Sequence, residues 1–132
     1  MAISEDFMRD FMIALRHHPG ELARVTNALS LYGVNIRSVA AIAVAGQAAL
    51  HLIPDNVESA RSALNANNIP FEENEVVVVL LENRAGELTA VASKLAEAGL
   101  NLEAAFVMGV SDDLIELAIV SDNAKKAKKV LE

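Results

Sequence analysis

The sequence predicts an α+β protein in which one module of strands and helices is used twice in tandem. The first observation is a repeat, because Gly20-Glu21-Leu22 recurs 66 residues later as Gly86-Glu87-Leu88. The second is that the same offset carries Gly33-Val34-Asn35 onto Gly99-Leu100-Asn101. A register that is kept across a loop, a helix and the start of a strand indicates duplicated structure. The third observation is the order of elements within each copy.

The first copy begins with a short apolar strand at residues 11–15, bounded by turn residues. The helix that follows has Leu22, Val25, Leu29 and Tyr32 at helical spacing, which predicts one buried face, and Gly33 ends it. The remaining elements are predicted from alternation, turn residues and helix-capping residues. They are strands at 35–45 and 48–53, a helix at 57–66 capped by residues 54–56, and a strand at 69–75.

The second copy repeats this order but stops early. Residues 76–81 form its first strand, and Leu88, Val91, Leu95 and Ala98 mark its first helix, which ends at Gly99. Strands at 101–110 and 114–120 and a helix at 124–131 follow. The order βαββαβ is the ferredoxin-like pattern, with an antiparallel sheet and helices on one face, and the second repeat lacks its last strand. We predict the repeats to span residues 1–75 and 76–132.

The missing strand leaves a sheet edge whose backbone groups need partners. Either the N-terminal segment near residues 7–10 covers this edge, or another subunit does, so a homodimer is expected. Glu72, Glu73 and Glu75 are placed to prevent uncontrolled pairing at the edge.

Composition and charge exclude several classes of function. The chain is 53% hydrophobic and 22% charged, as in soluble globular proteins. Its net charge of −7, without a basic stripe, argues against nucleic acid as a partner. The longest low-polarity run, residues 39–50, is too short for a membrane span, and the acidic N-terminus does not resemble a secretory signal. We therefore expect a cytoplasmic protein that has no membrane partner.

No pattern of catalytic residues stands out. The side chains of the adjacent His17 and His18 diverge on an extended loop, and no second cluster supplies further zinc ligands. His51 lies between leucines in a strand, which favours a surface or packing role. The chain has no cysteine, nucleophile elbow or phosphate loop. The sequence thus predicts a protein that is not an enzyme and has no metal or cofactor.

The two repeated strand-to-helix loops, residues 16–22 and 82–88, are the strongest candidates for a binding site. The first N–H groups of a helix lack internal partners and carry partial positive charge, which suits a carboxylate. The alternative is that Gly20 and Gly86 only allow the turn, while Glu21 and Glu87 satisfy the helix N-terminus. Asn35 likewise has two possible roles. Its side chain either stabilises its own turn by a hydrogen bond or offers a donor and an acceptor to a ligand. The same two alternatives apply to Asn101, and the presence of an asparagine at both positions favours a ligand-binding site.

These residues resemble a known family. Asn-Arg-x-Gly-x-Leu or His-Pro-Gly-x-Leu before a helix, and Gly-Leu-Asn-Leu or Gly-Val-Asn-Ile after it, are similar to the ACT domain, a regulatory module of amino-acid biosynthetic enzymes. The resemblance covers nearly the whole chain as two tandem copies, and is greatest to stand-alone tandem ACT proteins without a catalytic domain. It implies allosteric, regulatory binding of small ligands, usually amino acids, at interfaces between ACT units.

The resemblance also implies which residues contact the ligand. In the first copy these are His17, Pro19, Gly20, Glu21, Leu22 and Asn35, and in the second they are Asn83, Ala85, Gly86, Glu87, Leu88 and Asn101. His17 stands where the second copy has Asn83, and Ala85 replaces the usual proline, so the two sites need not bind equally.

Two functions are compatible with these patterns. One is a small-molecule sensor whose ligand alters contacts between subunits or with a regulated partner protein. The other is a structural or interaction module that binds no ligand and assembles through its sheet edges.

Overall fold

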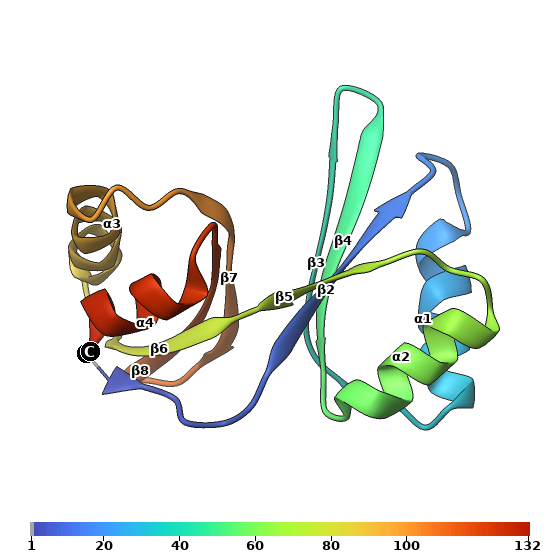
Figure 1. Ribbon diagram of the computed structural model, residues 1–132, viewed down its shortest axis with the longest axis horizontal. Coiled ribbons are helices and arrows are strands. Elements are labelled where there is room, and N and C mark those ends of the chain that lie inside the picture. Colours follow the sequence, from blue (N-terminus) through green and yellow to red (C-terminus); the bar gives the residue numbers. More distant parts are fainter. Residues whose placement is uncertain (1) are drawn as a thin grey trace. The chain divides into compact units, whose positions relative to one another are not determined.

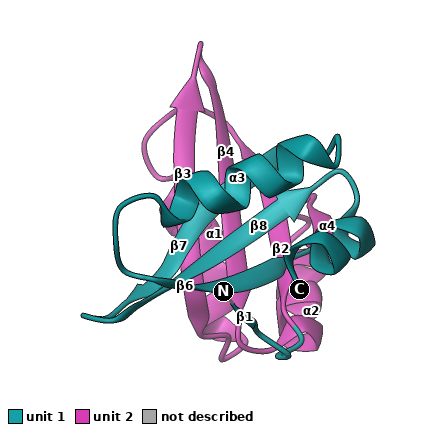
Figure 2. Ribbon diagram, turned by 90° about the vertical axis from the view of Figure 1, so that its left-hand side faces the viewer, with its two compact units in different colours: residues 1–7, 75–132 teal, residues 8–74 magenta. Residues whose placement is uncertain are grey.

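The computed structural model describes residues 2–132, which form two compact α+β units (Figures 1 and 2). Unit 2 comprises residues 8–74, and unit 1 comprises residues 75–132 together with residues 2–7. Each unit has one four-stranded antiparallel sheet and two helices. The predicted tandem ferredoxin-like fold is therefore confirmed. No helix within residues 2–132 is long and apolar enough to cross a membrane.

Unit 2 contains the complete βαββαβ order of the first repeat. Its sheet has the strand order β3-β4-β2-β5. In the register of the central strands, Phe11 lies opposite Leu52 and Ile13 lies opposite Leu50. The elements are β2 (Arg9–Leu15), α1 (Glu21–Leu31), β3 (Ile36–Val44), β4 (Gln47–Pro54), α2 (Val57–Ala66) and β5 (Glu72–Glu75).

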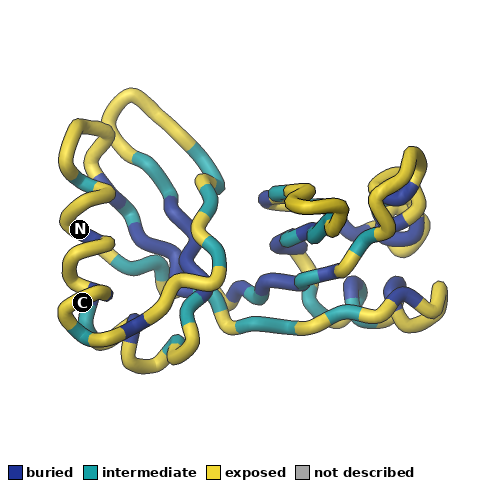
Figure 3. Tube along the Cα trace, turned by 90° about the horizontal axis from the view of Figure 1, so that it is seen from above, coloured by how far each residue is buried: buried dark blue, intermediate teal, exposed yellow. Residues whose placement is uncertain are grey.

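The core of unit 2 lies between one face of this sheet and its two helices. Buried residues follow the central strands and the inner sides of the helices, whereas loops and hairpin tips are exposed (Figure 3). The buried face of α1 differs from the prediction, because Leu22 and Tyr32 are 44% and 45% exposed. Val25 and Leu29 are buried as predicted, and Ala28 joins them in the core, so only the two ends of the predicted face are exposed.

Unit 1 repeats the architecture with its own core. The strand order is β1-β6-β8-β7, and Val79, Leu95, Ile119 and Leu131 are at most 1% exposed. The elements are β1 (Ala2–Ile3), β6 (Val77–Glu82), α3 (Glu87–Glu97), β7 (Leu102–Val110), β8 (Leu114–Ser121) and α4 (Ala124–Leu131).

The short strand β1 takes the place of the missing last strand of the second repeat. It pairs antiparallel with β6, with Ala2 opposite Leu80 and Ile3 opposite Val79, and the Ser4 N–H donates to the Val78 carbonyl over 2.9 Å. The N-terminus covers this edge, in agreement with one of the two alternatives, but with residues 2–4 and not with residues 7–10. This pairing also separates residues 2–7 from the rest of the predicted 1–75 segment.

An ion-pair cluster attaches β5 to the rest of unit 2. The Glu73 carboxylate accepts hydrogen bonds from Arg61 Nε, from Arg61 Nη2 at 2.8 Å and from Arg9 Nε at 3.3 Å. The side chain of Glu73 is only 15% exposed, so this residue holds the edge strand in place and does not act as the predicted guard against pairing with other chains. The hydrogen bonds from Arg61 are the main cause that lowers the pKa of Glu73 below its usual value.

This cluster predicts a pH-dependent stability. Because its pKa is lowered in the folded state, Glu73 stabilises the fold above the unfolded-state pKa of about 4.3, and this stabilisation is lost as the pH falls through the folded-state value. Glu73→Gln should lower the free energy of unfolding by about 1 kcal/mol at pH 7 and by much less at pH 3, measured by urea unfolding. The control is Glu72→Gln, since Glu72 is exposed. An equal loss at both pH values would contradict the prediction.

Candidate ligand site

The segment from residue 16 to residue 20, called loop 1, leaves β2 and enters α1 beside the β3–β4 hairpin. β2 ends at Leu15, opposite Ala48, while the hairpin continues past it to a turn at Ala45 and Gly46. Gly20 precedes α1 with a φ of 95°, a left-handed conformation that favours glycine. No side chain among the described residues caps the helix, so the N–H groups of its first turn remain available.

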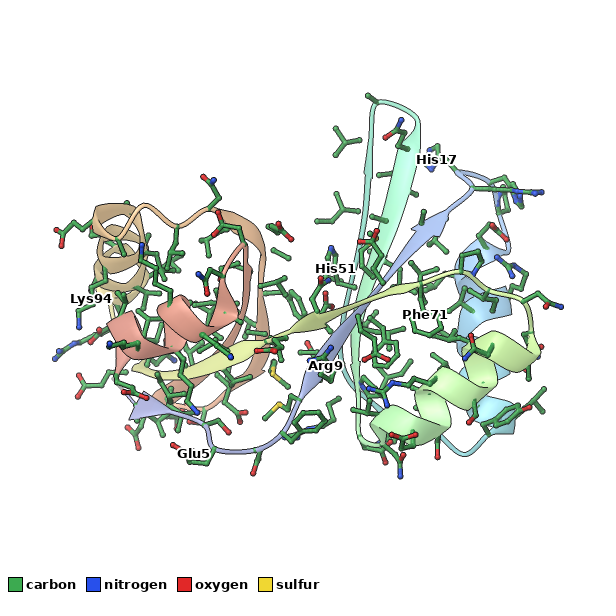
Figure 4. The ribbon with its side chains drawn as sticks, viewed as in Figure 1. Glu5, Arg9, His17, His51, Phe71 and Lys94 are labelled. Atoms are coloured by element: carbon green, nitrogen blue, oxygen red, sulfur yellow. The ribbon has the colours of Figure 1, made fainter. Side chains whose placement is uncertain are left out.

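Two adjacent hollows open between loop 1 and the hairpin. One has a volume of about 390 Å³ and is lined by His17, Pro19 and Leu22 on one side and by the hairpin on the other. The second has a volume of about 690 Å³, and its lining includes His17 and His51, both of which are labelled in Figure 4. The hollows exist because small side chains line this part of the sheet. These are Ala14, Ala41, Ala43, Ala48 and Ala49.

Glu21 holds loop 1 against the start of α1. Its Oε1 accepts a hydrogen bond from the Arg16 N–H at 3.2 Å, and its Oε2 accepts one from Arg24 Nε at 2.9 Å. These bonds lower the pKa of Glu21, with the bond from Arg24 the larger cause. Glu21 lines the smaller hollow, but its carboxylate is already engaged within the loop.

The equivalent loop of unit 1, residues 82–86, called loop 2, has the same backbone turn with different side-chain contacts. Gly86 has a φ of 90° before α3. The Asn83 N–H donates to the Asp113 carbonyl at 2.9 Å, and Asn83 Nδ2 donates to the Ser111 carbonyl at 3.0 Å. Among the described residues no such bond holds His17, which occupies the matching position of loop 1. The Asn83 amide is therefore committed to its own unit.

The two predicted asparagines lie at the far ends of the helices. The Asn35 N–H donates to Asp55 Oδ1 at 3.0 Å, and the Asp55 N–H donates back to the Asn35 carbonyl at 2.9 Å. Asn101 and Asp122 repeat this exchange, with both distances at 3.2 Å. Since the eleven residues of α1 rise by roughly 16 Å, a single unit does not bring Asn35 and loop 1 together.

The structure adds residues to the site that were not among the predicted ligand contacts. Arg16 and Ile42 line both hollows, and His51 lines the larger one. The unusual run of small residues in β3 and β4 is the signal that points to this region. Within residues 2–132 no group of three or more His, Asp or Glu side chains is arranged to hold a metal ion.

Comparison with known proteins relates the fold to solved structures. No protein-family model matches the chain, and no curated protein matches it in sequence. The structure of a protein from Bacteroides thetaiotaomicron superposes with a TM-score of 0.82 at 24% identity, covering 93% of this chain and 85% of that one. The regulatory subunit of aspartate kinase from Thermus thermophilus gives a TM-score of 0.67 at 20% identity, covering 98% of this chain and 91% of that one.

A longer enzyme contains the same architecture as one part of its chain. Aspartate kinase from Clostridium acetobutylicum, an allosteric enzyme, matches with a TM-score of 0.56 at 14% identity, over 95% of this chain and 32% of that one. The fold of this protein is therefore that of the regulatory parts of aspartate kinases.

Proposed function

We propose that this protein is a regulatory protein of ACT type that binds an amino acid and has no catalytic activity of its own. The observation that carries the proposal is the hollow beside loop 1, where His17, Pro19 and Leu22 face small hairpin residues next to an uncapped helix N-terminus. Regulatory subunits with the same fold support it. Loop 2 keeps the same turn, with Ala85, Gly86, Glu87 and Leu88 as the matching candidate residues.

An amino acid would be held by its charged and apolar parts separately. Its carboxylate would accept hydrogen bonds from the first N–H groups of α1, which also carry the positive end of the helix dipole. Its side chain would enter the hollow between Leu22 and the alanines of β3. Because Asn35 lies at the other end of α1, it does not reach this site within its own unit, so an asparagine that joined the site would have to come from another unit.

A homodimer is part of the proposal. The edge covered by β1 no longer requires a partner, but β3 is also an edge strand, and its Val39, Ile42 and Val44 are 51%, 60% and 66% exposed. Apolar edge strands of this kind pair with other chains unless they are protected. Light scattering is expected to give the mass of a dimer, and Ile42→Lys should shift the mass towards the monomer. A monomeric mass of the unaltered protein at high concentration would contradict this part.

The second candidate, an assembly module without a ligand, is favoured by the same exposed edge. The two candidate functions differ in whether a ligand changes the state of the protein. A sensor must bind its ligand more tightly in one state than in another, and the resulting change at a subunit or partner-protein surface transmits the signal in the cytoplasm. An assembly module shows no such dependence.

A thermal-shift screen with the twenty amino acids tests the proposal. A ligand that binds only the folded protein raises its stability, by about 2.7 kcal/mol at one hundred times the Kd, so at least one amino acid at millimolar concentration should raise the Tm by several degrees. Ala43→Leu, which narrows the hollow, should reduce this shift. Ala23→Leu, on the exposed side of α1, is the matched control. If no amino acid changes the Tm, the assembly module is the better proposal.

A further inference from the structure

We infer that the cavity formed by the two hollows beside loop 1 selects ligands with net negative charge, such as an acidic amino acid. The surface at loop 2 does not have this preference. The inference rests on the proposed function and specifies the chemical class of the ligand. Its basis is the different charge of two loops that have the same backbone turn.

Arg16 provides the main positive charge at the cavity. It lines both hollows, and among the described residues no carboxylate pairs with its guanidinium. The other acid and base at the start of α1 neutralise each other, because Glu21 binds Arg24 at 2.9 Å. Loop 1 therefore carries a positive charge that pairs with no carboxylate among the described residues, on a residue that lines both hollows, in a chain whose net charge is −7.

Loop 2 has the opposite balance. Glu82 stands at the position that corresponds to Arg16 in the 66-residue repeat. Arg84 pairs with Glu82 at 2.9 Å and with Glu87 at 2.8 Å, so one cation serves two carboxylates. The helix N-termini are alike in the two units, and the difference in ligand preference comes from these side chains.

Further groups around loop 1 favour an anion over a cation. The first N–H groups of α1 add partial positive charge. His18 Nδ1 lies 3.0 Å from the Pro19 carbonyl oxygen, a contact that helps to order the loop. Within residues 2–132 Glu21 is the only acid that lines either hollow, and both of its oxygens already accept hydrogen bonds. A cationic side chain would find no free carboxylate among these lining residues.

The size and the walls of the cavity limit the ligand further. A volume of about 390 Å³ suits a small molecule, and Leu22 and Ala43 offer apolar contact beside the charged end. A compound with two carboxylates separated by a short carbon chain would place one at the N-terminus of α1 and the other at Arg16.

Calorimetric titration with matched ligands tests this inference. L-Glutamate should bind at least about tenfold more tightly than its neutral isostere L-glutamine, because a hydrogen bond to a charged partner exceeds one between neutral groups by about this factor. L-Aspartate and L-asparagine form a second pair, and L-lysine should bind most weakly. Arg16→Gln should remove the preference for the acid, whereas Arg84→Gln, an equal change of charge in loop 2, should leave it unchanged. Circular dichroism checks that both variants are folded.

The outcomes separate the inference from the proposed function. If L-glutamine binds as tightly as L-glutamate, or if Arg84→Gln acts like Arg16→Gln, the charge inference is overturned while amino-acid binding stands. If no amino acid binds but succinate binds in an Arg16-dependent manner, the charge inference stands and the amino-acid proposal is wrong. If none of these compounds binds, both are wrong.

Discussion

Replacing His51 with alanine is expected to lower the free energy of unfolding by about 3 kcal/mol, because it removes a partner from a buried carboxylate. The Asp10 side chain is fully buried, and its Oδ2 accepts hydrogen bonds from His51 Nδ1 at 2.8 Å and from Asn74 Nδ2 at 3.1 Å. Among the described residues its Oδ1 has no partner. Without His51 the carboxylate would keep a single hydrogen bond in a site that excludes water.

Urea unfolding of three variants tests this account. His51→Ala should be the least stable, and adding Asp10→Asn to it should restore part of the loss, since an unpaired amide costs less to bury than an unpaired carboxylate. Asp10→Asn alone shows how much the pair matters when His51 is present. A loss below about 0.5 kcal/mol for His51→Ala would mean that the pair behaves like a surface contact.

Phe11→Ala should have a similarly large effect, about 4 kcal/mol, through loss of core packing. Phe11 is fully buried in the sheet of unit 2, and its ring lies 5.4 Å from that of Phe71. Phe7 provides a matched control because it is 75% exposed, so that Phe7→Ala should change the stability by less than about 0.5 kcal/mol.

Hydrogen exchange can show where the Phe11 substitution acts. The buried residues form two separate clusters, one in each unit, and Phe11 belongs to that of unit 2. Amides of β2 and β4 should therefore lose protection before those of β6 and β8. Equal loss of protection in both units would show that the two cores unfold as one cooperative body.

Local signals made many of the elements predictable. The helices at 57–66 and 124–131 have the predicted bounds, because Asn56 and Asn123 cap them by accepting hydrogen bonds from the N–H groups of Ser59 and Lys126. Gly20 marks the left-handed turn before α1 for an equally local reason. The turn of the candidate site was thus predictable, since few residues other than glycine adopt this conformation.

The contacts that complete the candidate site are not local. Arg16 and Glu82 occupy equivalent positions, yet only the structure shows that Arg16 lies at a cavity while Glu82 binds Arg84. The burial of Glu21 depends on Arg24 and on the Arg16 N–H, contacts that helical periodicity does not reveal, so the predicted buried face of α1 included the exposed Leu22 and left out Glu21. Side chains at equivalent positions of the repeat therefore form different contacts, because the residues around them in the folded protein differ.

By itself, the sequence determined the duplication, the order of the elements and the two strand-to-helix turns, because each depends on residues close together in the chain. Only the tertiary structure decided that β1 completes the sheet of unit 1, and that Asn35 lies apart from loop 1. Backbone hydrogen bonds between strands carry little sequence information, so Ala2 and Ile3 gave no signal that they would pair with Leu80 and Val79. Asn35 and loop 1 lie at opposite ends of α1, so the length of the folded helix keeps them from contacting the same ligand within one unit.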